Sequence, residues 1–470
     1  MIEVTIYWTT KTETYTITAR HYPTYQTLPY LLEIGEISRA VNLDGAIENS
    51  TVEIVLSNHD GHFNDLLDEL NRKIVITDED IVIFTGYICD FPESEYGYFK
   101  IKGDIFSFLE APINLEINKT RFPSVPPENE GWGNILYGTA NVAPGMLNAR
   151  RINTNKYLAS YTPLSSIIAV QKNGVDVTSL TTWEVDPETG YTYINHNSTE
   201  NILTFSALGP TTGGTLIENP ALMLQDLVEN FSTSITLEGI TESSSIFSER
   251  GYTGNITYID DNMTWISLFK LFSMNFNCKV IFTRAGQVKI KVIRWGMETP
   301  VKTIPPNVVK DFVYTLVRSM KNRWTRKFQY IPVVKEYKMT PVDIPGNTAV
   351  NSVGEFEQKY VAAEATSTDV ALREAFFLKK KIIEYTFSLP RKEANSLEIG
   401  DTIYIRHRKN LFSEYRQVQI LRESRKPGTG FIQFTGYDMT EINKRTFILQ
   451  AADHPEVAVL GNEENSPVLW

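Results

Sequence analysis

Apolar residues recur at every second position in many short segments of this 470-residue chain, and this period constrains its fold more than any other feature. Thr51–Ser57 is the clearest example, with Val52, Ile54 and Leu56 on one side. A strand alternates its side chains across a sheet, whereas a helix needs a period of 3.6 residues. Each such segment therefore predicts a β-strand with one buried face.

Turn-forming residues follow several of these segments. Asp60-Gly61 comes soon after the first one, and Asn173-Gly174 ends an apolar segment at 166–172. Both dipeptides accept the positive φ angles of tight turns, so they predict hairpins. Further strands are expected at 81–88 with its partner 98–103, and at 383–389, 402–406, 416–421 and 431–437.

Three stretches have the period of an amphipathic helix. Asn219-Pro220 predicts the start of the first, because asparagine caps helices and proline suits their first turn. The second is expected to open at Asp261 or Asn262 and to precede a hairpin at 279–292, and the third is expected to be capped near Ser367 or Thr368. The expected buried stripes are Leu224, Leu227, Val228 and Phe231; Trp265, Leu268, Phe269 and Phe272; and Ala371, Ala375, Leu378 and Ile382.

The length predicts several hydrophobic cores, because a single core rarely serves more than about 250–300 residues. A proline-rich linker at 122–131 marks one boundary. The predicted fold class is mainly β (α+β). The expected domains are 1–118, a first β-barrel; 119–215, a small inserted β domain; 216–304, a helix-plus-hairpin α+β domain; 305–440, a second β-barrel with one helix at about 367–382; and 441–470, an extended C-terminal tail.

Charge and hydropathy exclude two classes of function. The net charge of −11 repels phosphate at long range, so broad affinity for nucleic acid is not expected. No apolar stretch reaches the ~18–20 residues of a membrane span, and the N-terminus alternates like a strand rather than a signal peptide. We therefore expect a soluble intracellular product, or one that is assembled inside a cell.

The sequence contains no recognisable metal or cofactor site. Cys89 and Cys278 are far apart in strand-like runs, so we interpret them as small buried hydrophobic residues. His59 and His62 are three positions apart across a predicted turn, without a further histidine or cysteine nearby, and a surface turn is the favoured interpretation. No cofactor and no metal are expected.

Catalytic motifs are equally absent: there is no nucleophile elbow, phosphate-binding loop or dinucleotide fingerprint. Acidic clusters at 60–69 and at Asp260-Asp261 are explained by turn and capping roles, although a glycosidase needs only two carboxylates. Several aromatic residues give the inserted domain the potential to bind sugars, and core packing is the favoured use of their rings. These residues are Trp132, Tyr137, Trp183, Tyr191 and Tyr193.

The last three residues are Val468, Leu469 and Trp470, and they follow an acidic, proline-containing stretch. A loose terminus is one interpretation. The other is an apolar plug that docks into a neighbouring subunit, since a tryptophan is a frequent anchor in protein interfaces. Both interpretations remain open, and these three residues are the candidate partner-docking site.

Several motifs resemble, in the same order, those of phage tail baseplate hub proteins. Val52–Phe63, with the letters VEIVLSNHDGHF, is similar to their early strand and turn, and 83–88 to the strand that follows. The segment 135–138 resembles the start of an insertion in some members. The helix-then-hairpin stretch at 263–288 and the segment 397–403 are similar to later elements of the family.

This resemblance implies a non-enzymatic virion protein, the structural hub of a tail baseplate. Family members have two tail-tube-like barrels per chain and form a homotrimer that adapts a hexameric tail tube to a trimeric spike. The implied partners are a tail tube or distal tail protein, a spike or central tip protein, and viral DNA that passes through the channel without specific binding. The implied location is the virion tail, after assembly in the host cytoplasm. A tail-tip carbohydrate-degrading enzyme and a peripheral glycan-binding baseplate protein are the alternative functions.

Overall fold

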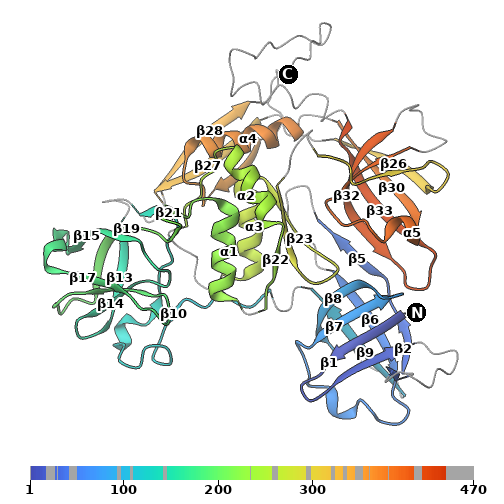
Figure 1. Ribbon diagram of the computed structural model, residues 1–470, viewed down its shortest axis with the longest axis horizontal. Helices are drawn as coiled ribbons and strands as arrows, with labels where there is room; N and C mark the ends of the chain where they lie inside the picture. The colour runs from blue at the N-terminus through green and yellow to red at the C-terminus, as the bar shows by residue number, and fades with distance from the viewer. Residues whose placement is uncertain are drawn as a thin grey trace, which may run out of the picture. The chain divides into compact units, whose positions relative to one another are not determined.

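The computed structural model describes residues 2–16, 27–28, 30–41, 50–92, 97–105, 109–140, 146–232, 234–256, 263–292, 298–318, 323–331, 336–343, 353–358, 360–378, 381–406 and 415–440. The chain forms two compact units. Unit 1 contains Met1–Ala111, Cys278–Met320 and Phe376–Trp470, and unit 2 contains Pro112–Asn277 and Lys321–Ala375. Strands dominate both units (Figure 1), which confirms the mainly β fold class. Within the described residues, every helix is too short or too polar to cross a membrane.

Unit 1 is built almost entirely from strands. Its first stretch contains β1 (Ile2–Tyr7), β2 (Thr12–Thr16), β3 (Thr27–Leu28), β4 (Leu31–Ile34), β5 (Ile37–Ala40), β6 (Thr51–Ser57), the 3-10 turn η1 (Asn64–Leu66), β7 (Lys73–Asp78), β8 (Ile81–Asp90) and β9 (Tyr98–Asp104). Its later stretches contain β23 (Cys278–Phe282), β24 (Val288–Val292), β25 (Lys302–Ile304), β26 (Lys310–Arg318), β30 (Lys381–Pro390), α5 (Arg391–Ala394), β31 (Thr402–Ile405), β32 (Arg416–Arg425) and β33 (Phe431–Asp438).

Two groups of five strands in unit 1 have the same connectivity. The first repeat consists of β4, β6, β7, β8 and β9, arranged in the sheet as β7-β8-β9-β6-β4. The second repeat consists of β26, β30, β31, β32 and β33, arranged as β31-β32-β33-β30-β26. All neighbours within each repeat are antiparallel. Numbered along the chain, both repeats have the order third, fourth, fifth, second, first.

The repeats also share their register at a β-bulge. Ile88 of β8 pairs with Gly103 of β9, and the ladder then skips one residue of β8. Ile420 of β32 pairs with Gly436 of β33 and is followed by the same skip in β32. A Cβ at Gly436 would lie 2.4 Å from the backbone oxygen of Gln419, so the backbones approach here too closely for a side chain.

A left-handed residue introduces the third strand of each repeat. Asn71 has a φ of 60° and Gly400 a φ of 86°, a region that asparagine and glycine enter at little cost. The Asn71 N–H donates to the Ile88 carbonyl at 2.8 Å, and the Gly400 N–H donates to the Ile420 carbonyl at 2.8 Å. The matching hydrogen bonds extend the equivalence of the two repeats beyond strand order.

The inward faces of the repeats consist of large apolar side chains. The predicted face of Thr51–Ser57 is confirmed, because Val52, Ile54 and Leu56 are at most 1% exposed. Alternate residues of β30 occupy the corresponding positions opposite β33, and they are also fully buried. These residues are Tyr385, Phe387 and Leu389.

Unit 2 contains a β module, helices and a small sheet. The module comprises β10 (Glu116–Ile117), η2 (Pro127–Asn129), β11 (Gly131–Trp132), β12 (Thr139–Ala140), β13 (Leu147–Asn153), β14 (Lys156–Ser160), β15 (Ser166–Lys172), β16 (Val175–Asp176), η3 (Thr178–Leu180), β17 (Thr182–Val185), β18 (Thr192–Asn195), β19 (Ile202–Leu208), β20 (Thr211–Thr212) and β21 (Thr215–Leu216). The remaining elements are α1 (Pro220–Phe231), β22 (Leu237–Glu238), α2 (Ile240–Glu249), α3 (Trp265–Phe276), β27 (Arg323–Ile331), β28 (Glu336–Asp343), β29 (Val353–Gln358) and α4 (Glu364–Leu378), of which the part up to Ala375 belongs to unit 2.

The β module has the hairpins that its turns predict. Asn173 and Gly174 have φ angles of 49° and 79°, and they join β15 to β16 in an antiparallel pair. Positive φ at both central residues is the geometry of a type I′ turn. The module's strands form a sheet in the order β16-β15-β19-β13-β14-β18-β17, around a core that includes Phe205 and Tyr157.

The first helix agrees with its prediction. The Asn219 side chain accepts a hydrogen bond from the Ala221 N–H at 3.1 Å, and Pro220 is the first residue of α1. The predicted start of the second helix at Asp261 or Asn262 is wrong, since α3 begins at Trp265 with Thr264 as its cap. The Thr264 hydroxyl accepts from a backbone N–H of the first turn, which is the role expected of the two earlier residues.

The third helix and one unpredicted helix show where tertiary structure overrides local pattern. α4 spans Glu364–Leu378 rather than 367–382. Ile382 lies in β30 and pairs with Val317 of β26, because hydrogen bonding to a neighbouring strand outweighs helical periodicity at this point. α2 follows Gly239 and has three serines in succession at 243–245, so its sequence lacked a clear apolar stripe.

The compact units cut across the expected domain boundaries. The stretch 305–440 is divided, because β27, β28 and β29 form a separate sheet in unit 2. The stretch 216–304 is divided as well, with α1 and α3 in unit 2 and the β23–β24 hairpin in unit 1. Sequence neighbours with different apolar partners therefore belong to different cores.

We predict that Gly436→Ala destabilises unit 1 by about 1–3 kcal/mol, the usual cost of forcing atoms into a packed interior. The new methyl group would displace the β32 backbone at Gln419. Equilibrium unfolding in urea measures the change. Gly430→Ala is the matched control, because no atom lies within 4 Å of its added Cβ. Equal stability of the two variants would contradict the close approach of the β32 and β33 backbones at Gly436.

Candidate functional site

One short strand joins the two repeats of unit 1. After Gly35 the chain no longer pairs with β6. The next strand, β5, pairs antiparallel with Arg422–Arg425 at the end of β32. The Val41 N–H continues this pairing by donating to the Leu421 carbonyl at 3.0 Å. β5 thus precedes β6 in the sequence but completes the sheet of the second repeat (Figure 1).

The β23–β24 hairpin packs against both repeats. Its Ile281 belongs to a buried apolar cluster with Val41, Ile399 and Leu421. At its turn, a Cβ added to Gly286 would lie 2.7 Å from a side-chain atom of Thr85 in β8. The hairpin therefore closes the space between the first and second repeats.

Five charged side chains meet beside this hairpin and form what we name the junction cluster. Arg39 comes from β5, Arg284 from the hairpin turn, and Glu423 and Arg425 from β32. These four are at most 5% exposed. Glu398 completes the cluster, and its side chain is 28% exposed. Charged residues are rarely so deeply buried unless they are paired.

Glu423 is at the centre of the junction cluster. Its carboxylate accepts hydrogen bonds from Arg39 and Arg425, and from Arg284 at 2.9 Å. Arg39 also donates to Glu398 at 2.9 Å. A single carboxylate therefore binds the arginines of three chain segments that are distant in the sequence.

The electrostatics of Glu423 favour a structural role. Burial alone would raise the pKa of Glu423, but Arg39, Arg284 and Arg425 outweigh it and lower the pKa to about 2. Such a carboxylate stays ionised at neutral pH and is a poor general base. Glu423 is therefore suited to holding strands together rather than to transferring protons.

A second buried polar group extends the junction. Lys279 of β23 is 1% exposed, and its ammonium donates to the side-chain oxygen of Gln419 at 2.9 Å. Gln419 in turn donates to Glu298 at 2.9 Å. Burial lowers the pKa of Lys279 to about 8, although Glu298 opposes this shift.

A salt bridge links the outer parts of the repeats. The Arg391 guanidinium of α5 lies 2.7 Å from the carboxylate of Asp78, which is the last residue of β7. The Asp78 side chain is 9% exposed and that of Arg391 is 23% exposed. Partial burial of both groups makes this contact stronger than a typical surface pair.

The turn after β6 contains the histidines that the sequence singled out. The Asp60 carboxylate accepts from the His62 N–H at 3.1 Å and from the Tyr30 hydroxyl, which confirms its turn role. The His62 ring stacks on Tyr30 and lies 3.1 Å from the Glu13 carboxylate. Among the described residues, histidine, cysteine and carboxylate groups form no set of three that could hold a metal.

The other acidic candidates have structural partners or lie outside the described residues. Glu69 accepts from the Thr9 N–H at 2.6 Å and from Arg72 at 3.1 Å. Asp260 and Asp261 lie outside the described residues.

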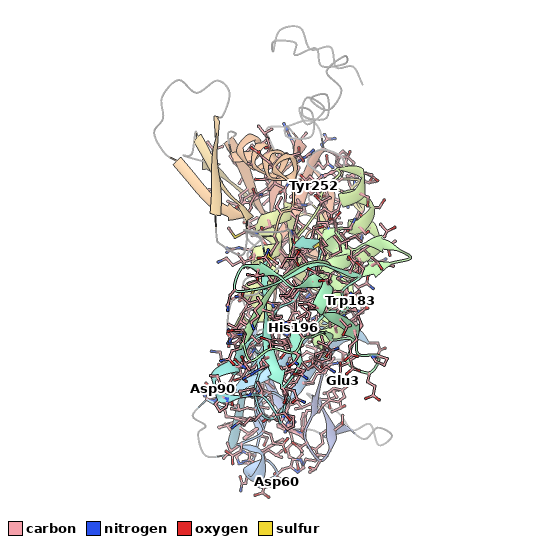
Figure 2. The ribbon with its side chains drawn as sticks, turned by 90° about the vertical axis from the view of Figure 1, so that its left-hand side faces the viewer. Glu3, Asp60, Asp90, Trp183, His196 and Tyr252 are labelled. Atoms are coloured by element: carbon pink, nitrogen blue, oxygen red, sulfur yellow. The ribbon has the colours of Figure 1, made fainter. Side chains whose placement is uncertain are left out.

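Aromatic residues of the inserted module are mostly packed. Tyr137 is fully buried and donates to Asp226 at 2.6 Å, and Tyr193 is 5% exposed. Tyr191 packs edge-on against Tyr161. Trp183 is the exception, at 40% exposure (Figure 2). The interpretation as core packing is therefore confirmed for Tyr137 and Tyr193 and fails for Trp183.

The two cysteines differ in burial. Cys278 is 1% exposed, as predicted. Cys89 is only half-buried, because it is the residue skipped at the β8 bulge. Burial raises the pKa of its thiol to about 11. The candidate docking residues Val468, Leu469 and Trp470 lie outside the described residues.

Sequence reasoning missed the junction cluster. A usable signal was present in β5, where Arg39 occupies the same phase as the buried Ile37. In β32 the bulge after Ile420 shifts the inward phase onto Glu423 and Arg425. A charged residue in line with the buried apolar residues of its strand predicts a buried ion pair. In β32 this alignment can be recognised only when the position of the bulge is known.

We predict that Glu423→Gln destabilises unit 1 by about 3–5 kcal/mol, because it leaves buried arginines without their central anion. The folded-state pKa of about 2 lies below the ordinary 4.5, so the unfolded chain binds more protons at acidic pH. The stabilisation from Glu423 is therefore complete above pH 4.5 and is lost as the pH falls towards 2. Urea unfolding at several pH values measures both effects.

Glu393→Gln is the control for this variant. Glu393 pairs with Lys302 at 2.8 Å, with both side chains more than a quarter exposed, and such a pair contributes about 0–1 kcal/mol. A Glu423→Gln variant as stable as Glu393→Gln would show that the junction cluster does not hold the repeats together.

Comparisons with known proteins identify similar folds among solved structures only. No protein-family model matches the chain, and no curated protein matches it. The 43 kDa tail protein of prophage MuSo2 from Shewanella oneidensis is 8% identical, with 93% of this chain and 97% of that chain covered and a TM-score of 0.45.

Two further tail proteins have similar values. The tail protein from Neisseria meningitidis MC58 is 8% identical, with 94% of this chain and 97% of that chain covered and a TM-score of 0.47. The prophage tail protein gp18 from Listeria monocytogenes EGD-e is 10% identical, with 97% and 98% covered and a TM-score of 0.44. All three of these structures are tail proteins.

Proposed function

We propose that the chain is a non-enzymatic structural hub of a phage-type tail baseplate. In this role it adapts a hexameric tail tube to a trimeric spike and lines the channel through which DNA passes. Its partners are a tail tube or distal tail protein, a spike or central tip protein, and further copies of itself. The proposal assigns the chain to the same class of assembly as its structural neighbours.

The observation that carries this proposal is the pair of repeats in unit 1. Each repeat has the same five-strand order, the same bulge and the same left-handed entry to its third strand. Three copies of such a chain present six equivalent sheets. A ring of this kind has threefold symmetry in its chains and approximate sixfold symmetry in its sheets, which is what an adaptor between a hexamer and a trimer requires.

The junction cluster supports the same role. A hub bears load between a tube and a spike, so the two sheets of each chain need a rigid connection. Glu423 and its arginines provide one, because buried charge pairs cannot separate without leaving a charge unpaired in the interior. The described part of the cluster offers no reactive group that an enzyme would need.

Charge supports passage of DNA rather than binding. With a net charge of −11, the chain has a long-range field that opposes tight contact with phosphate. DNA would slide along such a lumen without being retained. The carboxyl-terminal residues Val468, Leu469 and Trp470 remain the proposed docking segment for a neighbouring subunit.

The first test is the oligomeric state of the full chain. At tens of micromolar, analytical ultracentrifugation is expected to give three times the chain mass of 53.5 kDa, and negative-stain images are expected to show a ring with six similar lobes around an opening. A monodisperse monomer that also fails to join the tail tube protein would count against a hub.

The second test addresses carbohydrate cleavage. We expect the full chain to leave peptidoglycan and capsule gels uncleared in zymography, since Asp60 and Asp186 both accept hydrogen bonds from backbone N–H groups of their own turns. Asp60→Ala and Asp186→Ala serve as matched variants. Clearing by the unaltered chain that disappears in either variant would replace the structural role with an enzymatic one.

A further inference from the structure

The two repeats differ in the path of their first strand. In the first repeat, the Gly35 N–H donates to the Glu53 carbonyl of β6 at 2.8 Å. The chain then stops pairing with β6 and continues as β5. In the second repeat, β26 stays beside β30 as far as the pair Arg318 and Lys381. The first strand thus continues into another sheet in the first repeat, whereas it stays in its own sheet in the second repeat.

The shared register shows which residues correspond. Gly103 pairs with Val52, and Gly436 pairs with Tyr385, so Val52 and Tyr385 are equivalent. The residues that follow them, Glu53 and Thr386, are therefore equivalent to each other as well. Gly35 lies opposite Glu53 and Val313 lies opposite Thr386. The segment Tyr314–Arg318 therefore corresponds to 36–40, which contains β5.

This part of β26 is an exposed apolar edge. β26 is the last strand of its sheet in the described part of the chain. Val313 is 59% exposed, Tyr314 57% and Leu316 43%. Val313 lies on one face of the strand, and Tyr314 and Leu316 lie on the other. Proteins usually protect such an edge with charges, a proline or a covering segment, and exposed apolar surface of this kind marks an interaction site.

The first repeat has the matching acceptor. Within the chain, β5 pairs with Arg422–Arg425, the residues that follow the bulge in β32. The equivalent bulge in β8 follows Ile88, so Asp90 and Phe91 occupy the places of Arg422 and Glu423. Asp90 is exposed and Phe91 is half-buried, and β8 ends at Asp90.

We infer that Tyr314–Arg318 of one copy pairs with the end of β8 in a second copy, as β5 pairs with β32 within one chain. This inference rests on the proposed ring and identifies the surface that closes it. Joining the second repeat of one chain to the first repeat of the next is a head-to-tail contact, and such contacts generate a ring when the rotation between copies closes. The occupant of the β26 edge is therefore another copy of this chain.

The contact between copies differs chemically from the contact within a chain. Arg39 lies opposite Glu423 in the internal pairing, and the corresponding positions between copies hold Val317 and Phe91. The ion pair inside the chain thus corresponds to an apolar pair at these positions, while the next pair of positions holds Arg318 and Asp90, which have opposite charges.

The first experiment changes the edge without touching the junction cluster. The full-length double variant Tyr314→Lys with Leu316→Lys places two charges on β26, a substitution that natural edge strands use against pairing. We expect its trimer-to-monomer midpoint in sedimentation velocity to rise at least tenfold in concentration. The control is Val175→Lys with Leu180→Lys, which adds the same charges at positions 65% and 71% exposed in unit 2 and should remain trimeric.

The second experiment tests the register directly, and it remains informative should the lysine variant fold poorly. The equivalence places Arg318 of one copy opposite Asp90 of the next. In a Cys89→Ser background, Arg318→Cys with Asp90→Cys should form disulfide-linked chains on a non-reducing gel. Arg318→Cys with Ile81→Cys, at the other end of β8, should not.

The outcomes separate this inference from the proposed function. A trimer that survives the β26 lysines, or one that forms no disulfide between positions 318 and 90, overturns the edge contact and leaves the hub in place. A wild-type chain that stays monomeric and joins no tail tube protein overturns both. Loss of the trimer in the β26 variant alone, together with the specific disulfide, establishes the contact.

Discussion

The ion pairs around Glu423 hold together strands that are far apart in the sequence. Arg39 arrives from β5, Arg284 from a hairpin turn and Arg425 from the same strand as Glu423. Removing Glu423 would leave these arginines without their shared anion in a dry interior, where an unpaired ion is costly. The arrangement therefore requires β5 to leave its own sheet, and the relation between the two repeats follows from that departure.

The repeats are alike in backbone geometry rather than in residue identity. Asn71 in one repeat matches Gly400 in the other, because both residues tolerate a left-handed conformation. The glycines at 103 and 436 both lie opposite the residue that precedes the bulge. Elsewhere, side chains of different shape fill the same positions. The two repeats therefore share the positions at which the backbone conformation restricts the choice of residue.

Much of the local structure could be predicted from the sequence. Alternation identified β6 and the final strands, and Asn173-Gly174 identified a hairpin, because each signal is complete within a few residues. The sequence did not reveal that 323–358 leaves the second repeat to form a separate sheet. Strand patterns specify a buried face but not the sheet that buries it.

The candidate site was harder to predict, for a related reason. Arg39 and Glu423 look like ordinary strand charges until a bulge sets the phase of β32. Tyr314 and Leu316 look like core residues, although both are exposed in this chain. Their partners lie in distant segments or in another molecule, so no local pattern records them. The clearest sequence signal of the junction cluster was a charged residue at a strand position that faces inward.

The pairing of β5 with β32 has a consequence for synthesis of the chain. Residues 37–40 leave the ribosome about 380 residues before 422–425, and translation at about 5–20 residues per second separates them by roughly 20–80 seconds. During this time β5 and its arginine have no partner strand. β5 must therefore wait until residues 422–425 have been synthesised, so its arginine stays without the carboxylate of Glu423 over this interval.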